Sequence, residues 1–170
     1  MRVKVIGYWL LVIVSLAFSS CRNDIVYSQF HSISYPDGTI TSSENWHMDS
    51  VVRFDFPIPD TTFDYTVTIY LRHTERYPYQ NIWLFAGDSL HRDTINSFLA
   101  DDRGRWYGNH QHGLIETSVF IGENRHFSRI DSNYIEIQHA MRDTILHGIM
   151  DIGVEIVKSE KRKVKSNGKE

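Results

Sequence analysis

The sequence predicts an all-β fold: an antiparallel β-sandwich of about seven or eight strands, preceded by an N-terminal signal helix. Several segments alternate apolar and polar residues with a period of two, which is typical of strands that bury one face. Short turns separate these segments, and no long amphipathic helical pattern follows the N-terminal segment. Because a sheet with one apolar face must bury it, we expect two packed sheets, with a closed barrel as the alternative.

Three strands are expected in the first half of the chain. Residues 25–29 suit an edge strand, and a Pro-Asp-Gly turn follows at residues 36–38. Residues 52–56 alternate strictly and end at Pro57, which cannot donate to a strand ladder. Residues 65–72 show the clearest alternation in the chain, so we expect this strand to lie over the core.

Five more strands are expected in the second half. Residues 82–86 are short and apolar, as in a strand that is covered on both faces. Residues 95–100 are ambiguous between strand and other structure, but they end at an Asp-Asp-Arg-Gly turn. The remaining strands are expected at residues 114–122, 134–141 and 152–156, with a short turn or helical piece near residues 141–146.

The N-terminal segment has the layout of a secretory signal that ends at the only cysteine of the chain. Arg2 and Lys4 precede an apolar stretch of 14 residues, which is shorter than the roughly 20 residues that a membrane-spanning helix needs. Residues 18–21, Phe-Ser-Ser-Cys, look like the lipobox of bacterial lipoproteins, in which the cysteine is acylated and the signal is cut before it. An ordinary signal with a chance cysteine is the alternative.

The chain divides into a signal peptide (1–20), a β-sandwich domain (21–157) and a basic tail (158–170). The domain has ten arginines, no lysine and 19 acidic residues, whereas the tail has six basic and two acidic residues. An acidic domain argues against a nucleic-acid partner, because phosphate binding needs clustered basic residues. The tail is expected to be disordered and solvated, with contact to anionic lipid headgroups as the alternative.

No catalytic, metal-binding or cofactor-binding pattern is evident in the sequence. With Cys21 acylated, no thiol remains, and no Gly-x-Ser-x-Gly elbow occurs. His110 and His112 could form a metal-binding pair on one strand face, although a polar loop is favoured. The pair Asp101–Asp102 could bind a hard cation, although a turn cap is favoured. We therefore expect a protein that is not an enzyme and that needs no metal and no cofactor.

Aromatic and arginine side chains near the predicted strand ends are the candidates for contact with a partner or ligand. Exposed aromatic rings can stack on sugars or form protein hot spots, but core filling is the favoured reading for Trp83 and Trp106. For the arginines, pairing with nearby acids is favoured over contact with an acidic partner. The candidates are Arg72, Tyr77, Tyr79, Trp83, Arg105, Trp106, Tyr107 and Arg142.

Three motifs follow the lipobox in a fixed order. Residues 72–85 carry Tyr-Pro-Tyr and Asn-Ile-Trp-Leu-Phe, and residues 99–108 carry Leu-Ala-Asp and Gly-Arg-Trp. Residues 138–153 carry Ala-Met-Arg and Asp-Ile-Gly. By the order and spacing of these motifs, the chain resembles the gliding motility lipoprotein GldH family of the Bacteroidetes, and the resemblance covers nearly the whole mature chain without the basic tail.

The resemblance implies an envelope lipoprotein that gliding requires and that is linked to the type IX secretion apparatus, without enzymatic activity. The only functional residue to carry over is the lipidated cysteine, here Cys21, and the implied partners are membrane lipid and other gliding and secretion proteins. We interpret the domain as a non-catalytic adaptor or assembly factor. The alternative is a periplasmic glycan-binding module that stacks sugars on Trp83, Trp106 or Tyr107.

The residues after the cysteine bear on the choice of membrane. Arg22 stands where an aspartate would favour retention in the inner membrane, and Asp24 alone is a poor match to the acidic cluster of surface-exported lipoproteins. We therefore expect the periplasmic face of the outer membrane, with the inner membrane as the alternative.

Overall fold

The computed structural model describes residues 24–33, 44–88 and 91–161, which form 11 strands and no helix. Eight strands are long, and they confirm the all-β prediction: β1 (Ile25–Ser32), β3 (Val52–Phe56), β4 (Phe63–His73), β5 (Asn81–Gly87), β6 (Arg92–Phe98), β8 (Leu114–Arg125), β9 (Asn133–His139) and β11 (Ile149–Lys161). Three strands have three residues each: β2 (Asn45–His47), β7 (Asn109–Gln111) and β10 (Ile145–His147).

The eight long strands lie where the alternation predicted strands, and the three short ones exceed the expected number. Three residues are too few for a period of two to stand out in a sequence. β10 occupies the end of the segment for which a turn or helical piece was expected, and it pairs with β2. The ambiguous residues 95–100 fall mostly in β6, which is an edge strand of its sheet and pairs there with β5.

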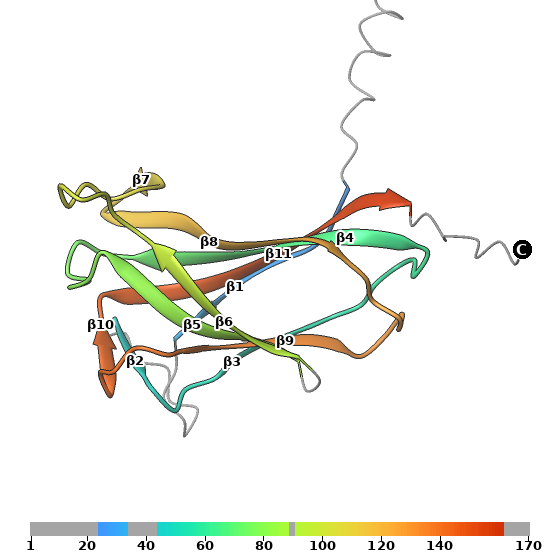
Figure 1. Ribbon diagram of the computed structural model, residues 1–170, viewed down its shortest axis with the longest axis horizontal. Helices are drawn as coiled ribbons and strands as arrows, with labels where there is room; N and C mark the ends of the chain where they lie inside the picture. The colour runs from blue at the N-terminus through green and yellow to red at the C-terminus, as the bar shows by residue number, and fades with distance from the viewer. Residues whose placement is uncertain (1–23, 34–43, 89–90, 162–170) are drawn as a thin grey trace, which may run out of the picture.

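The strands form two facing sheets, which Figure 1 shows as two layers. The larger sheet has the order β1-β11-β4-β8-β7, and the smaller has the order β3-β9-β5-β6. β10 and β2 form a separate two-stranded sheet at one end. Every pairing is antiparallel. The protein is therefore a sandwich and not the closed barrel that was the alternative.

The core lies between the two sheets and is built from alternate residues. In β4, Val67, Ile69 and Leu71 are buried, and from the other sheet Phe54 and Ile137 pack against the same cluster. Burying one such side chain stabilises the fold by roughly 1.5–3 kcal/mol. A shift of one residue in register would turn this row of β4 outward, so the core fixes the pairing of β4 with β8 and β11.

The two ends of the described chain meet at one end of the sandwich. The Lys158 N–H donates a hydrogen bond to the Asp24 carbonyl at 2.7 Å, where β1 begins beside β11. β11 continues to Lys161, so residues 158–161 of the expected tail belong to a strand. The signal peptide with Cys21, the 36–38 turn and residues 162–170 lie outside the described residues. Across the described ranges, no helix is long and apolar enough to cross a bilayer.

Candidate functional site

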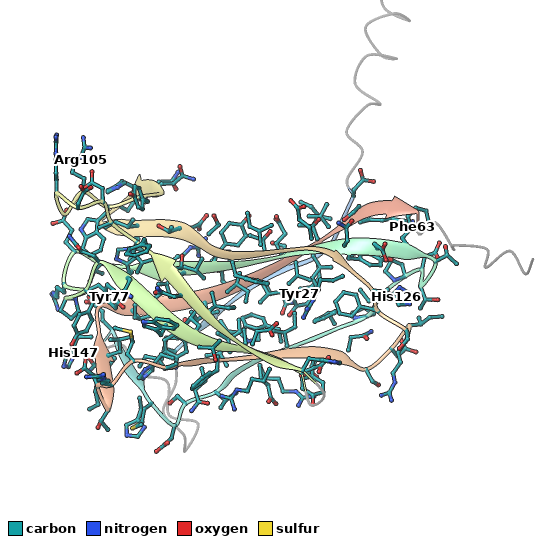
Figure 2. The ribbon with its side chains drawn as sticks, in the orientation of Figure 1. Tyr27, Phe63, Tyr77, Arg105, His126 and His147 are labelled. Carbon is teal, nitrogen blue, oxygen red and sulfur yellow. The ribbon has the colours of Figure 1, made fainter. Side chains whose placement is uncertain are left out.

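A surface hollow of about 600 Å³ lies at the end of the sandwich that carries the 77–80 loop, and we call it the Trp83 groove. Figure 2 shows Tyr77, Arg105 and His147 at this end, and Phe63 and His126 at the opposite end. The groove brings together three of the eight sequence candidates, Tyr79, Trp83 and Arg142. Its other lining residues are Asn81, Ala140, Met141 and Asp143.

Trp83 forms part of the groove because side chains along β5 point alternately to the core and to the outer face. Ile82 and Leu84 are fully buried in the core, so the ring between them points to the outer face and is 41% exposed. The Trp83 carbonyl accepts a hydrogen bond from the Ala140 N–H at 2.8 Å, and the Trp83 N–H donates to the Met141 Sδ at 3.3 Å. Residues 140–143 are thereby held beside β5. The prediction that Trp83 fills the core was therefore wrong. The expectation that this strand is covered on both faces was also wrong, because its outer face is partly exposed.

The opposite wall of the groove is fixed by a contact between Tyr79 and Asp143. The Tyr79 hydroxyl donates a hydrogen bond to the Asp143 carboxylate. This bond raises the pKa of the Tyr79 phenol. Arg142 lies beside this pair, is exposed, and makes no ion pair with any residue in the described part of the chain. The groove therefore combines two aromatic rings with a guanidinium that has no ion-pair partner among the described residues.

Tyr77 supports the groove from the core side. It is 2% exposed, its hydroxyl donates to the Asn81 carbonyl at 2.8 Å, and its ring lies edge-on to Tyr79 at 5.9 Å. Burial raises the pKa of Tyr77 above its usual range. Gly148 lies against the same loop with φ 83°, and a Cβ there would be 2.5 Å from the Tyr77 nitrogen. This close approach in a left-handed conformation requires glycine.

A second group of candidates follows β6 and does not line the groove. Trp106 is partly buried and lies edge-on to the His73 ring at 4.7 Å, so it belongs to the rim of the core. Tyr107 is 47% exposed outside the groove. Arg105 donates through its backbone N–H and its Nε to the Asp101 carboxylate. These bonds lower the pKa of Asp101 and make it the turn cap that the sequence favoured.

Arg72 lies on the outer face of the larger sheet, away from the groove. Its Nε donates to the Glu116 carboxylate at 2.7 Å, and its guanidinium lies 3.6 Å from the centre of the Phe30 ring. Arg72 therefore pairs with a nearby acidic residue, as the sequence analysis favoured. The pair is part-buried, with the two side chains 33% and 31% exposed, and ion pairs near the surface typically contribute roughly 0–1 kcal/mol to stability.

The structure adds groove residues that the sequence reasoning missed. Asn81 lies on the same strand face as Trp83, and this could have been read from the alternation. Asp143 lies in a segment without periodicity, and its partner Tyr79 is 64 positions away, so no local pattern signals the contact. His110 lies in β7, and His112 follows directly after it. The described residues contain no group of three His, Asp or Glu side chains that could hold a metal ion.

The chain is similar to known proteins both at the level of a family and at the level of individual relatives. The family model described as "GldH lipoprotein" matches residues 34–156, a span that includes the groove. The chain is 29% identical over 164 residues to a gliding motility lipoprotein GldH homolog of Christiangramia forsetii, covering 89% of this chain and 95% of the relative. It is 27% identical over 168 residues to the gliding motility lipoprotein GldH of Flavobacterium johnsoniae, covering 92% and 98%.

The family match spans well over half of the chain, and the two relatives match it over almost their full lengths. The motifs that line the groove, in β5 and in residues 140–143, lie inside the matched span. This chain therefore belongs to the GldH lipoprotein family.

Proposed function

We propose that this protein is a lipid-anchored envelope lipoprotein of gliding motility and acts as a non-catalytic adaptor that holds a partner protein in the Trp83 groove. The observation that carries the proposal is the exposed Trp83 ring in a hollow beside Arg142, which forms no ion pair with any described residue. Trp, Tyr and Arg are the residues most enriched in the hot spots of protein interfaces. Family membership supports the link to gliding.

The apolar surface continues beyond the groove onto β6. In the pairing of β5 with β6, Asn81 lies opposite Phe98 and Trp83 lies opposite Asn96, so Trp83 and Phe98 share the outer face of the smaller sheet. Phe98 is 65% exposed. Neighbouring exposed aromatic side chains of this size typically mark an interaction surface. A partner would gain binding free energy by covering both rings.

The charge of the groove indicates what the partner offers. Arg142 presents a guanidinium without a carboxylate partner in the described residues, and the Asp143 carboxylate is already engaged by Tyr79. We therefore expect the partner segment to place an apolar side chain over Trp83 and a carboxylate against Arg142.

The position of the groove suits an anchored adaptor. β1 begins at Ile25, four residues after Cys21, and Ile25 pairs with Val157 in the part of β11 that leads to the Phe63 end, opposite the groove. A strand of 11 residues such as β4 spans roughly 35 Å, so acylation of Cys21 would hold the groove about that far from the lipid surface. Two or more acyl chains anchor a protein stably, which confines the domain near its membrane partners. We place it at the periplasmic face of the outer membrane, with the gliding and type IX secretion proteins.

The test is in vivo crosslinking followed by capture from membranes, combined with a gliding assay. Trp83→Ala and Arg142→Ala should each reduce capture of gliding or secretion proteins and slow gliding. Tyr107→Ala is the matched control, because it removes an equally exposed aromatic ring outside the groove. Cys21→Ala should leave the fold intact and abolish anchoring and gliding. Full gliding with Trp83→Ala, or equal loss with Tyr107→Ala, would show that the groove is not the docking site.

A glycan-binding module is the second candidate, and the same exposed ring favours it. Sugar rings stack on open tryptophan faces, and Asn81 and Asp143 would supply hydrogen bonds at the groove edge. Trp106 is too enclosed by His73 and the core to serve as such a platform. Sedimentation with purified peptidoglycan discriminates the two functions: binding that depends on Trp83, with no protein crosslink, would replace the adaptor proposal.

A further inference from the structure

Another surface hollow, of about 350 Å³, lies at the end of the sandwich opposite the Trp83 groove, and we call it the His126 hollow. Figure 2 shows His126 at this end of the molecule, together with Phe63. The hollow lies between the residues that flank the β5–β6 turn, the connection from β8 to β9, and the first residues of β9 (Figure 1). Its volume lies within the range of small-ligand sites, roughly 300–1,000 Å³.

Packing and a hydrogen bond hold the connection between β8 and β9 in place. The Phe127 ring packs against the core, edge-on to the rings of Phe56 and Tyr65 at centroid distances of 5.4 Å and 5.9 Å. Two residues further on, the Arg129 carbonyl accepts a hydrogen bond from the side-chain amide of Asn133 at 2.9 Å. The backbone that carries this wall of the hollow is therefore positioned before any ligand binds, which reduces the entropy lost on binding.

Several hydrogen-bond donors line the hollow without a partner among the described residues. The Arg129 guanidinium is exposed and makes no ion pair with any of those residues. The His91 ring and the hydroxyls of Ser128 and Ser132 likewise find no hydrogen-bond partner in the described part of the chain. A guanidinium forms bidentate hydrogen bonds to phosphate, and imidazole and hydroxyl groups donate to further oxygens. The hollow is therefore equipped to bind an oxyanion.

Carboxylates are scarce in the hollow, although the domain as a whole is acidic. Residues 21–157 contain ten arginines and 19 acidic residues. Among the described residues that line the hollow, the one carboxylate is that of Asp88, which accepts the His91 backbone N–H at 2.9 Å. Asp64 does not line the hollow, but its carboxylate lies 3.7 Å from Nδ1 of His126, which leaves Nε2 of that ring for a ligand. This local balance favours an anion over a cation.

The donors come from separate segments, which bears on the shape of the anion. His91 follows the β5–β6 turn, whereas Arg129 and the two serines belong to the connection between β8 and β9. A tetrahedral phosphate presents oxygens in several directions, whereas the two oxygens of a carboxylate share one plane. We propose that the His126 hollow binds a phosphate group, with Arg129, His91 and His126 as the principal donors.

The phosphate belongs either to a lipid headgroup or to a small soluble molecule, since the recognition chemistry is the same for both. Binding in the His126 hollow is separate from docking in the Trp83 groove and does not require an acylated Cys21. With the proposed anchor at Cys21, the start of β1 would bring this end of the sandwich to the membrane, which makes headgroup phosphate the nearest source.

The experiment follows the histidine ring signals of the full chain by proton NMR in maltoside micelles, which contain no phosphate. Inorganic phosphate is the soluble probe, titrated at constant pH and at an ionic strength held constant with chloride. The signals of His91 and His126, assigned from His91→Gln and His126→Gln, should shift and saturate in the millimolar range. The signals of His110 and His112, in and after β7 at the other end, should stay in place.

Three charge variants test the assignment of the donors. Arg129→Gln should weaken binding by roughly tenfold or more, because a charge-assisted hydrogen bond is lost. The matched control, Arg103→Gln, removes an exposed arginine from the Asp101 turn at the other end and should leave binding unchanged. Asp88→Asn keeps an oxygen that can accept the His91 N–H but removes the carboxylate charge, so it should tighten phosphate binding.

Nanodiscs separate the two sources of phosphate. The acylated chain is placed in discs of phosphatidylglycerol, or of a phosphate-free glycolipid, without soluble phosphate. Shifts of His91 and His126 that occur only with phosphatidylglycerol, and that Arg129→Gln removes, would assign the lipid headgroup. Shifts that require added inorganic phosphate would assign a soluble ligand.

Three results would overturn the proposal: no shift with either source, the same shift with chloride alone, or undiminished binding in Arg129→Gln. Loss of binding in Asp88→Asn, with the other histidine signals unchanged, would also contradict it, because the carboxylate would then be needed for a cation. The titration in micelles needs neither the anchor nor the Trp83 groove, so its failure is distinguishable from failure of the proposed function.

Discussion

Two buried histidines make the stability of the sandwich sensitive to mild acid. His73 and His139 are 0% and 3% exposed, and each has one ring nitrogen that finds no hydrogen-bond partner in the described part of the chain, Nε2 in His73 and Nδ1 in His139. Their other nitrogens contact the Thr74 and Trp46 carbonyls at 3.0 Å and 3.1 Å. Burial disfavours the charged imidazolium and lowers the pKa of both side chains.

The lowered pKa values set the sign and the pH window of the effect. In the unfolded chain a histidine takes up its proton near pH 6.5, whereas in the folded chain it stays neutral to a lower pH. The unfolded state therefore binds more protons below about pH 6.5, and the free energy of unfolding falls as the pH falls. Between about pH 7.5 and about pH 5.5, a histidine that stays neutral in the folded chain contributes a loss of at most roughly 1.4 kcal/mol, so the two together contribute at most roughly 3 kcal/mol.

The assay is urea denaturation of the domain across this pH range. His139→Phe keeps an aromatic ring against Trp46, whose ring lies edge-on at 5.2 Å, and removes the titrating group. Its pH dependence should be shallower by about half of the wild-type loss, even if its stability at neutral pH is lower. His112→Phe is the control, since this residue is exposed in a turn. A wild-type stability that is flat from about pH 7.5 to about pH 5.5, or an unchanged slope in His139→Phe, would refute the reasoning.

Three further predictions concern stability and local order. Gly148→Ala should destabilise the domain by more than Gly113→Ala, as measured by urea midpoints. Both substitutions cost about 1–2 kcal/mol because the backbone is left-handed at these positions, but only Gly148→Ala also places a Cβ against backbone atoms. Leu84→Ala should cost roughly 2–5 kcal/mol and Trp83→Ala no more than about 1 kcal/mol; equal costs would mean that β5 does not alternate as described. Asp101→Ala should accelerate hydrogen exchange at the two turn amides that it accepts from, while unchanged exchange would contradict its capping role.

The strands were predictable because their signal is local. In β3 the buried residues Val52, Phe54 and Phe56 alternate with exposed ones, and this pattern is visible in the sequence before any pairing is known. The same logic could have placed Trp83 outward, since its neighbours Ile82 and Leu84 are core residues. The apolar character of the segment suggested instead that both faces were covered.

The groove was only partly predictable because it depends on contacts between distant segments. Tyr79 meets Asp143, and Trp83 meets Met141, through pairings that no sequence periodicity reveals. The family motifs included Tyr79, Trp83 and Arg142, but nothing in their spacing showed that Tyr77 would be buried and Tyr79 exposed. The order of strands in the two sheets, which decides these neighbours, is a property of the whole fold.

The pairing of β1 with β11 has a mechanical consequence. If the protein is held by lipid at Cys21 and by a partner at the opposite end, a pulling force acts along the strands. β1 is joined to β11 at seven paired positions, from Ile25 to Ser32. A force along the strand loads these hydrogen bonds in shear, so they resist together, whereas a perpendicular force would open them one after another like a zipper. With the proposed anchor and partner, the pairing of β1 with β11 would carry tension along the strands.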